Sequence, residues 1–143
     1  MDNRNQSEYA KGLAAAVDGE LSEFRSLQES VQKLRGSQQQ LMQQLNENEM
    51  VKSELEKQDE NSPVFKLVGP VLMKHELSDA KQTVEKRIEF IQGDLEKTER
   101  RIADKENEAQ GVARKIQEIQ GRMQEEAKGQ AMEAARRAQE GQV

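Results

Sequence analysis

The stretch NSPVFKLVGPVLMKHEL, residues 61–77, decides how this chain folds. It concentrates Val, Phe and Pro in the middle of a chain that elsewhere has almost no dense apolar cluster. Pro63 ends any helix that precedes it, because its ring clashes with the preceding turn. Gly69 supplies the positive φ that the first central residue of a type II′ turn requires, and Pro70 suits the second position. The sequence therefore predicts a two-residue β-hairpin over residues 63–76.

A Gly69–Pro70 loop leaves large apolar side chains on both faces of this hairpin. The two faces carry Val64, Val68, Val71 and Met73 on one side, and Phe65, Leu67 and Leu72 on the other. An isolated hairpin is marginally stable in water, and its free edges invite pairing with another chain. We therefore predict that these side chains form a subunit-assembly surface in a sheet built from several chains. The alternative is a local core under the ends of the flanking helices.

The segments on either side of the hairpin repeat apolar residues with the heptad spacing of a coiled coil. In residues 8–58, the a and d positions are Leu13, Val17, Glu20, Phe24, Leu27, Val31, Leu34, Gln38, Leu41, Leu45, Asn48, Lys52 and Leu55. In residues 78–128, they are Lys81, Val84, Ile88, Ile91, Leu95, Thr98, Ile102, Lys105, Ala109, Val112, Ile116, Ile119 and Met123. The pattern predicts two long helices, the second with Ser78 as its N-cap.

A short connection between two helices of similar length turns the chain back on itself. We therefore expect a mainly α fold: an antiparallel two-helix coiled coil joined by a single β-hairpin, which assembles into an intersubunit β-barrel. Residues 1–143 are expected to form one domain. Its parts are a helix over 8–58, the hairpin over 63–76, a helix over 78–128 and a flexible tail over 129–143.

Composition argues against several other classes of protein. The chain is 34% hydrophobic and 3% aromatic, has a net charge of −5, and contains no Cys. Disulfides and thiolate metal sites are therefore excluded, and an acidic chain is poorly suited to nucleic acid. The sequence shows no signal peptide, no apolar run of membrane-spanning length and no motif for catalysis or phosphate binding. We expect an intracellular protein that is not an enzyme and uses no cofactor or metal. The single histidine, His75, is expected to be structural.

Three stretches resemble the β-type subunits of prefoldin, a hexameric co-chaperone. They are NEMVKSEL at 48–55, VFKLVGPVLMKHEL at 64–77, and TVEKRIEFI at 83–91, together with Ala80. The resemblance implies a hetero-hexamer of two α-type and four β-type subunits, whose hairpins form two β-barrels. It also implies an ATP-independent cytoplasmic protein that captures unfolded clients, such as actin and tubulin, and delivers them to the group II chaperonin. The α type would carry two hairpins, whereas this chain has one.

The expected client-binding residues lie at the far ends of the two helices from the hairpin. They are Tyr9, Leu13, Val17, Ile119, Met123 and Met132. Methionine suits a surface that binds many partners, and weak contacts from several arms would add by multivalency. The alternative is that Leu13, Val17, Ile119 and Met123 simply close the last heptads of the seam. A second function class also stays open, in which the chain is a coiled-coil tether or scaffold without chaperone activity.

Overall fold

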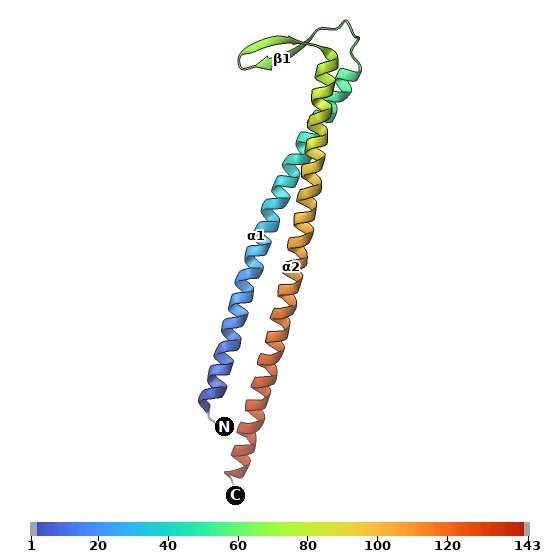
Figure 1. Cartoon of the computed structure of the whole chain (residues 1–143). Coiled ribbons are helices and arrows are strands. Elements are labelled where there is room, and N and C mark those ends of the chain that lie inside the picture. Colours follow the sequence, from blue (N-terminus) through green and yellow to red (C-terminus); the bar gives the residue numbers. More distant parts are fainter. Residues whose placement is uncertain (1–2, 142–143) are drawn as a thin grey trace. The chain divides into compact units, whose positions relative to one another are not determined.

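A computed structural model describes residues 3–141 of the chain. The elements follow in the order α1 (Asn3–Glu56), β1 (Val64–Val68), β2 (Val71–His75) and α2 (Leu77–Glu140). The described chain divides into two compact units, which share both helices. Unit 1 consists of Met1–Val31 and Asp104–Val143, and unit 2 consists of Gln32–Ala103. The predicted combination of two long helices with one hairpin is confirmed (Figure 1).

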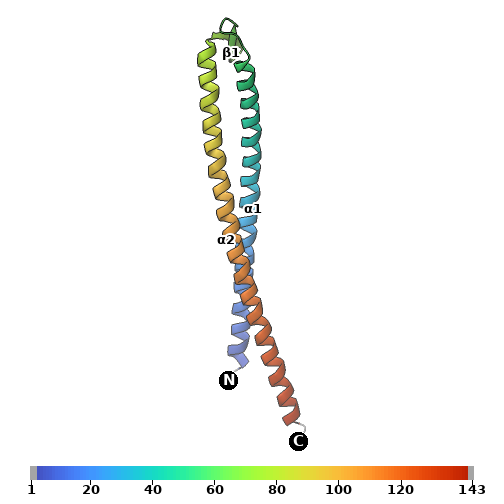
Figure 2. The ribbon, with the colours of Figure 1, turned by 90° about the vertical axis from the view of Figure 1, so that its right-hand side faces the viewer.

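Unit 2 contains the hairpin and the helix segments next to it. In this unit α1 and α2 run antiparallel, side by side (Figure 2). The α2 residues of the predicted seam are buried here, from Leu77 and Ala80 through Val84, Ile88 and Ile91 to Ile102. Thr98 is also buried, and its hydroxyl donates to the carbonyl oxygen of Asp94 at 2.8 Å. The one polar side chain buried in this row is therefore satisfied.

Unit 1 contains the beginning of α1 and the end of α2. Its buried residues are Leu13 and Leu27 on α1 and Val112 on α2. Across both units, every predicted a and d residue is buried or half-buried, so the predicted heptad register is confirmed. Side chains of a narrow seam supply most of the stability of such helices, because little else is removed from water.

The ends of the helices differ from the prediction. α1 begins at Asn3 and ends at Glu56, where the Gln58 side-chain amide donates to the carbonyl oxygen of Glu54 at 3.3 Å. α2 begins at Leu77, and the Ala80 amide donates to the carbonyl oxygen of Glu76 at 2.9 Å. Glu76 thus holds the N-cap position, and the predicted N-cap at Ser78 is wrong. The earlier start is accompanied by burial of Leu77, the first residue of the helix, which is 8% exposed.

The end of α2 is a second correction. The helix continues to Glu140, through residues that we expected to form a flexible tail. Residues 129–140 are rich in Ala, Gln, Glu and Arg, which favour helix. Two ion pairs, each between residues one turn apart, help to stabilise the helix here. They join Glu133 to Arg137 at 3.4 Å and Arg136 to Glu140 at 3.9 Å. Residues 142–143 of the expected tail lie outside the described residues. That residues 1–143 form a single domain stays a prediction.

Candidate assembly and client-binding surfaces

The hairpin has the register that the sequence predicts. Val68 pairs with Val71 and Leu67 with Leu72, around a loop of Gly69 and Pro70. Gly69 has a φ of 57°, as the turn requires. Within the described residues β1 and β2 form a two-stranded sheet, so each strand pairs with one other strand there and has one free edge. The free edges carry backbone groups that another strand is able to pair with.

The side chains predicted for assembly lie on this sheet and are largely exposed. Leu67 is 68% and Leu72 65% exposed, and Phe65, Val68, Val71 and Met73 are exposed as well. Val64 is half-buried at the root of the hairpin. These residues therefore do not form a local core under the helix ends, except at Val64. Contiguous exposed apolar surface of this kind marks a binding surface in soluble proteins.

The residues predicted for client binding divide into two groups. Leu13 is buried, and Val17, Ile119 and Met123 are half-buried, as expected for side chains that close the seam. Tyr9 is 50% and Met132 75% exposed. Only these last two present a free apolar surface in the folded chain. All six residues belong to unit 1.

Comparison with known proteins identifies the family. The family model for prefoldin subunits matches residues 19–123. The chain belongs to the prefoldin subunit family. Prefoldin subunit 6 of Mus musculus is 35% identical over 129 residues, which cover 90% of this chain and 99% of the mouse protein. Prefoldin subunit 6 of Saccharomyces cerevisiae is 37% identical over 87 residues, which cover 61% of this chain and 76% of the yeast protein.

A solved structure agrees with this assignment. The crystal structure of the prefoldin beta subunit from Thermococcus strain KS-1 superposes with a TM-score of 0.68 at 22% identity, covering 71% of this chain and 90% of that one. It shows that the fold is shared. The predicted likeness to β-type prefoldin subunits is confirmed, and the relatives from mouse and yeast narrow it to prefoldin subunit 6. Prefoldin subunits form hetero-oligomers with one another, and the chain is accordingly a co-chaperone subunit.

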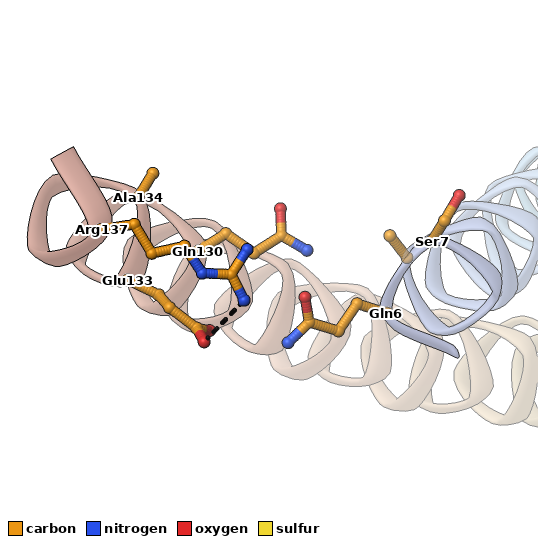
Figure 3. A pocket seen from close by; sticks show the side chains of 7 residues that line it. Gln6, Ser7, Gln130, Glu133, Ala134 and Arg137 are labelled. Carbon is orange, nitrogen blue, oxygen red and sulfur yellow. Dashed lines mark hydrogen bonds and ion pairs between the residues drawn. The ribbon is translucent and has the colours of Figure 1, made fainter. Parts of the chain in front are cut away.

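Unit 1 of this prefoldin subunit holds an open, polar cleft between the beginning of α1 and the end of α2. Figure 3 shows Gln6 of α1 and Gln130 and Arg137 of α2 around it, with the Arg137 guanidinium directed at Glu133. The cleft has a volume of about 580 Å³ and is lined by Gln6, Ser7, Ala10, Gln130, Glu133, Ala134 and Arg137. Continuing the heptads places Gln6, Ala10, Gln130, Glu133 and Arg137 at a and d positions. Amide, charged and small side chains occupy the seam here, and the helix ends diverge (Figure 2).

Two apolar hollows in unit 2 were not predicted from the sequence. The first, called the root hollow, has a volume of about 640 Å³ and is lined by Glu47, Met50, Val51, Glu54, Leu55, Gln58, Pro63 and Val64. The second has a volume of about 490 Å³ and is lined by Gln44, Asn48, Thr83, Lys86, Arg87, Phe90 and Ile91. Gln44, which lines the second hollow, and Val51, which lines the root hollow, are seven residues apart, so both hollows lie along one flank of α1. The sequence signal for these hollows was the presence of apolar residues outside the seam, namely Met50, Val51 and Phe90.

The described residues contain no group of three His, Cys, Asp or Glu side chains placed to hold a metal ion. Over the same residues, neither helix has a segment apolar enough to span a lipid bilayer. The chemistry that these surfaces offer is burial of apolar groups and pairing of strand edges.

Proposed function

We propose that this chain is a β-type subunit of a hetero-hexameric, ATP-independent co-chaperone. The hexamer captures unfolded proteins such as actin and tubulin in the cytoplasm and delivers them to the cytosolic chaperonin. The observation that carries this proposal is the exposed hairpin. Both of its faces carry exposed apolar side chains, and its two outer edges are unpaired within the described part of the chain. Membership of the prefoldin subunit family supports other subunits as the partners of these faces and edges.

The assembly step follows from the free energy of burial. Covering a Leu or Val side chain stabilises a complex by about 1.5–3 kcal/mol. The hairpin exposes six large apolar side chains, and an isolated two-stranded hairpin is only marginally stable in water. They are Phe65, Leu67, Val68, Val71, Leu72 and Met73. In the proposed assembly, Val64 to Met73 of this chain form an intersubunit β-barrel with the hairpins of the partner subunits.

The client-binding step is assigned to the far ends of the helices. Tyr9 and Met132 are exposed there, and Leu13, Val17, Ile119 and Met123 become available where the terminal heptads open. Opening is favoured because the seam continues into the polar cleft, where apolar side chains no longer hold the helices together. Several such ends in one complex give a high effective concentration for a non-native chain.

The first experiment measures mass by light scattering after co-expression with candidate α- and β-type prefoldin subunits. A species of about six subunits is expected, and it should be lost in the double variant Leu67→Glu with Leu72→Lys. The two new side chains face each other with opposite charge, so the hairpin itself keeps a favourable cross-strand pair. Lys66→Gln serves as the control, because it alters the same strand without removing apolar surface.

The client experiment uses assembled complexes with changes at the far end. Tyr9→Ser with Met132→Ser should lower the capacity to hold unfolded actin, without lowering the thermal stability of the complex. A stable homodimer that ignores the partner subunits and tolerates the hairpin variant would favour the tether function instead.

A further inference from the structure

The root hollow is an apolar surface that the chain itself leaves open. Met50 is 68% and Val51 47% exposed, and both line the hollow with Leu55 of α1 and Val64 of β1. It lies where the helix gives way to the hairpin. An apolar hollow that opens directly beside an assembly surface is a natural extension of that surface.

The hollow also has a definite charge. Glu47 and Glu54 line it and lie seven residues apart on the same line along α1. No Lys or Arg is among its lining residues. The neighbouring contacts leave both carboxylates accessible: the Gln43 amide donates to Glu47 at 3.4 Å, and Lys57 approaches Glu54 at 3.7 Å. The Lys57 pair is about 70% exposed on both sides, so water screens it and it contributes little.

The matching chemistry lies on one face of the hairpin. Phe65, Leu67 and Leu72 share that face with Lys74, and neither strand contains an acidic residue. All four side chains are exposed. The opposite face carries Val64, which lines the root hollow of its own chain, and Val64 pairs with the half-buried His75. The hairpin is therefore anchored at its root, through Val64 and His75, and its Phe65 face stays free. The rest of the opposite face, Lys66, Val68, Val71 and Met73, is exposed as well.

We propose that the root hollow receives the hairpin of a neighbouring β-type subunit whose free face has this same chemistry, three large apolar side chains and a lysine. The apolar side chains cover Met50 and Val51, and the lysine ammonium group lies beside Glu47 and Glu54. This inference rests on the proposed function, because it assumes an assembly of β-type subunits.

Site-specific crosslinking in the complete complex tests the contact. A photoreactive phenylalanine derivative replaces Met50, and its matched control replaces Met42, which is 53% exposed and lies at position e, on the other flank of α1. The expected result is a crosslink from position 50 to strand residues of a neighbouring subunit and none from position 42 to those strands. A crosslink from position 50 to a helix, to a client or to nothing in an intact complex would overturn the inference. Failure of the wild-type chain to join any complex would instead overturn the proposed function.

Charge reversal gives a second, independent measurement. Glu47→Lys with Glu54→Lys should lower the apparent affinity for the partner subunits by about tenfold, because the incoming lysine then meets like charge. Glu49→Lys with Glu56→Lys is the control. It makes the same change in charge at exposed positions with the same spacing, on the other flank of α1. Equal loss of affinity in both double variants would show a general charge effect and contradict the contact.

Discussion

Val64 and His75 lie directly opposite each other at the open end of the hairpin and are both half-buried, whereas the strand residues between them and the turn are exposed. The hairpin is therefore held to the rest of unit 2 at its root only. In the isolated chain, we expect amide hydrogens of β1 and β2 to exchange much faster than those around Ile88 and Ile102. Assembly should slow exchange in both strands. Strand amides that are already protected in the isolated chain would contradict this account.

The turn of the hairpin depends on the conformation of Gly69. Its φ of 57° lies in the left-handed region, and a Cβ built there meets nothing within 4 Å. Gly69→Ala therefore introduces backbone strain without a steric clash, at a cost of about 1–2 kcal/mol. Gly69→Asn should cost less, since Asn tolerates this region better. The measurement is the concentration of partner subunits needed for half assembly, with Ala expected to require more than Asn, and Asn more than Gly.

Phe90 and Ile91 are neighbours in sequence with opposite environments. Ile91 is 7% exposed within the seam, and Phe90 is 71% exposed beside the second hollow. Ile91→Ala should lower the free energy of unfolding by about 2–5 kcal/mol, because it leaves a cavity in the seam. Phe90→Ala should change it by less than about 0.5 kcal/mol. Urea unfolding of the isolated chain measures both, and a large loss from Phe90→Ala would mean that its ring packs within the chain.

The hairpin and the seam could be predicted because each depends on a local pattern. Gly69–Pro70 fixes the strand register, and the heptad repeat fixes which side chains face the partner helix. The helix boundaries could not be predicted as well. Glu76 takes the N-cap position although Ser78 is the better capping residue, and Leu77, the first helical residue, is buried.

The surfaces outside the repeat were harder to predict. The root hollow combines residues of α1 with Pro63 and Val64, which lie outside the heptad repeat. The repeat therefore does not indicate that these residues line one hollow. The expected tip residues were chosen for being apolar. Apolarity alone does not decide their burial, because Leu13 is buried whereas Tyr9 is 50% exposed. A residue's type indicates that it favours burial, but its position on the helix decides whether burial occurs.

Glu20 occupies a d position in the seam of unit 1, and its buried Oε2 atom has no hydrogen-bond partner among residues 3–141. A buried acceptor that lost its water opposes folding, and a leucine at a d position favours it. Glu20→Leu should therefore raise the free energy of unfolding by about 1–3 kcal/mol. Glu20→Gln, which keeps the shape, is the matched comparison and should give a smaller change. Destabilisation by Glu20→Leu would show that the carboxylate has a favourable partner.

Gly129 tests the last turns of α2, which extend through residues that the sequence predicted as a tail. Nothing lies within 4 Å of a Cβ built at Gly129, and its φ is not in the left-handed region. Gly129→Ala should therefore stabilise the surrounding helix by about 1 kcal/mol. Slower amide exchange over residues 125–137 is the expected readout. Gly121→Ala, an equally open helical position nearer the core of unit 1, is the control, and its effect should appear around Met123 instead. Unchanged exchange near Gly129 in the alanine variant would mean that these turns are not helical in solution.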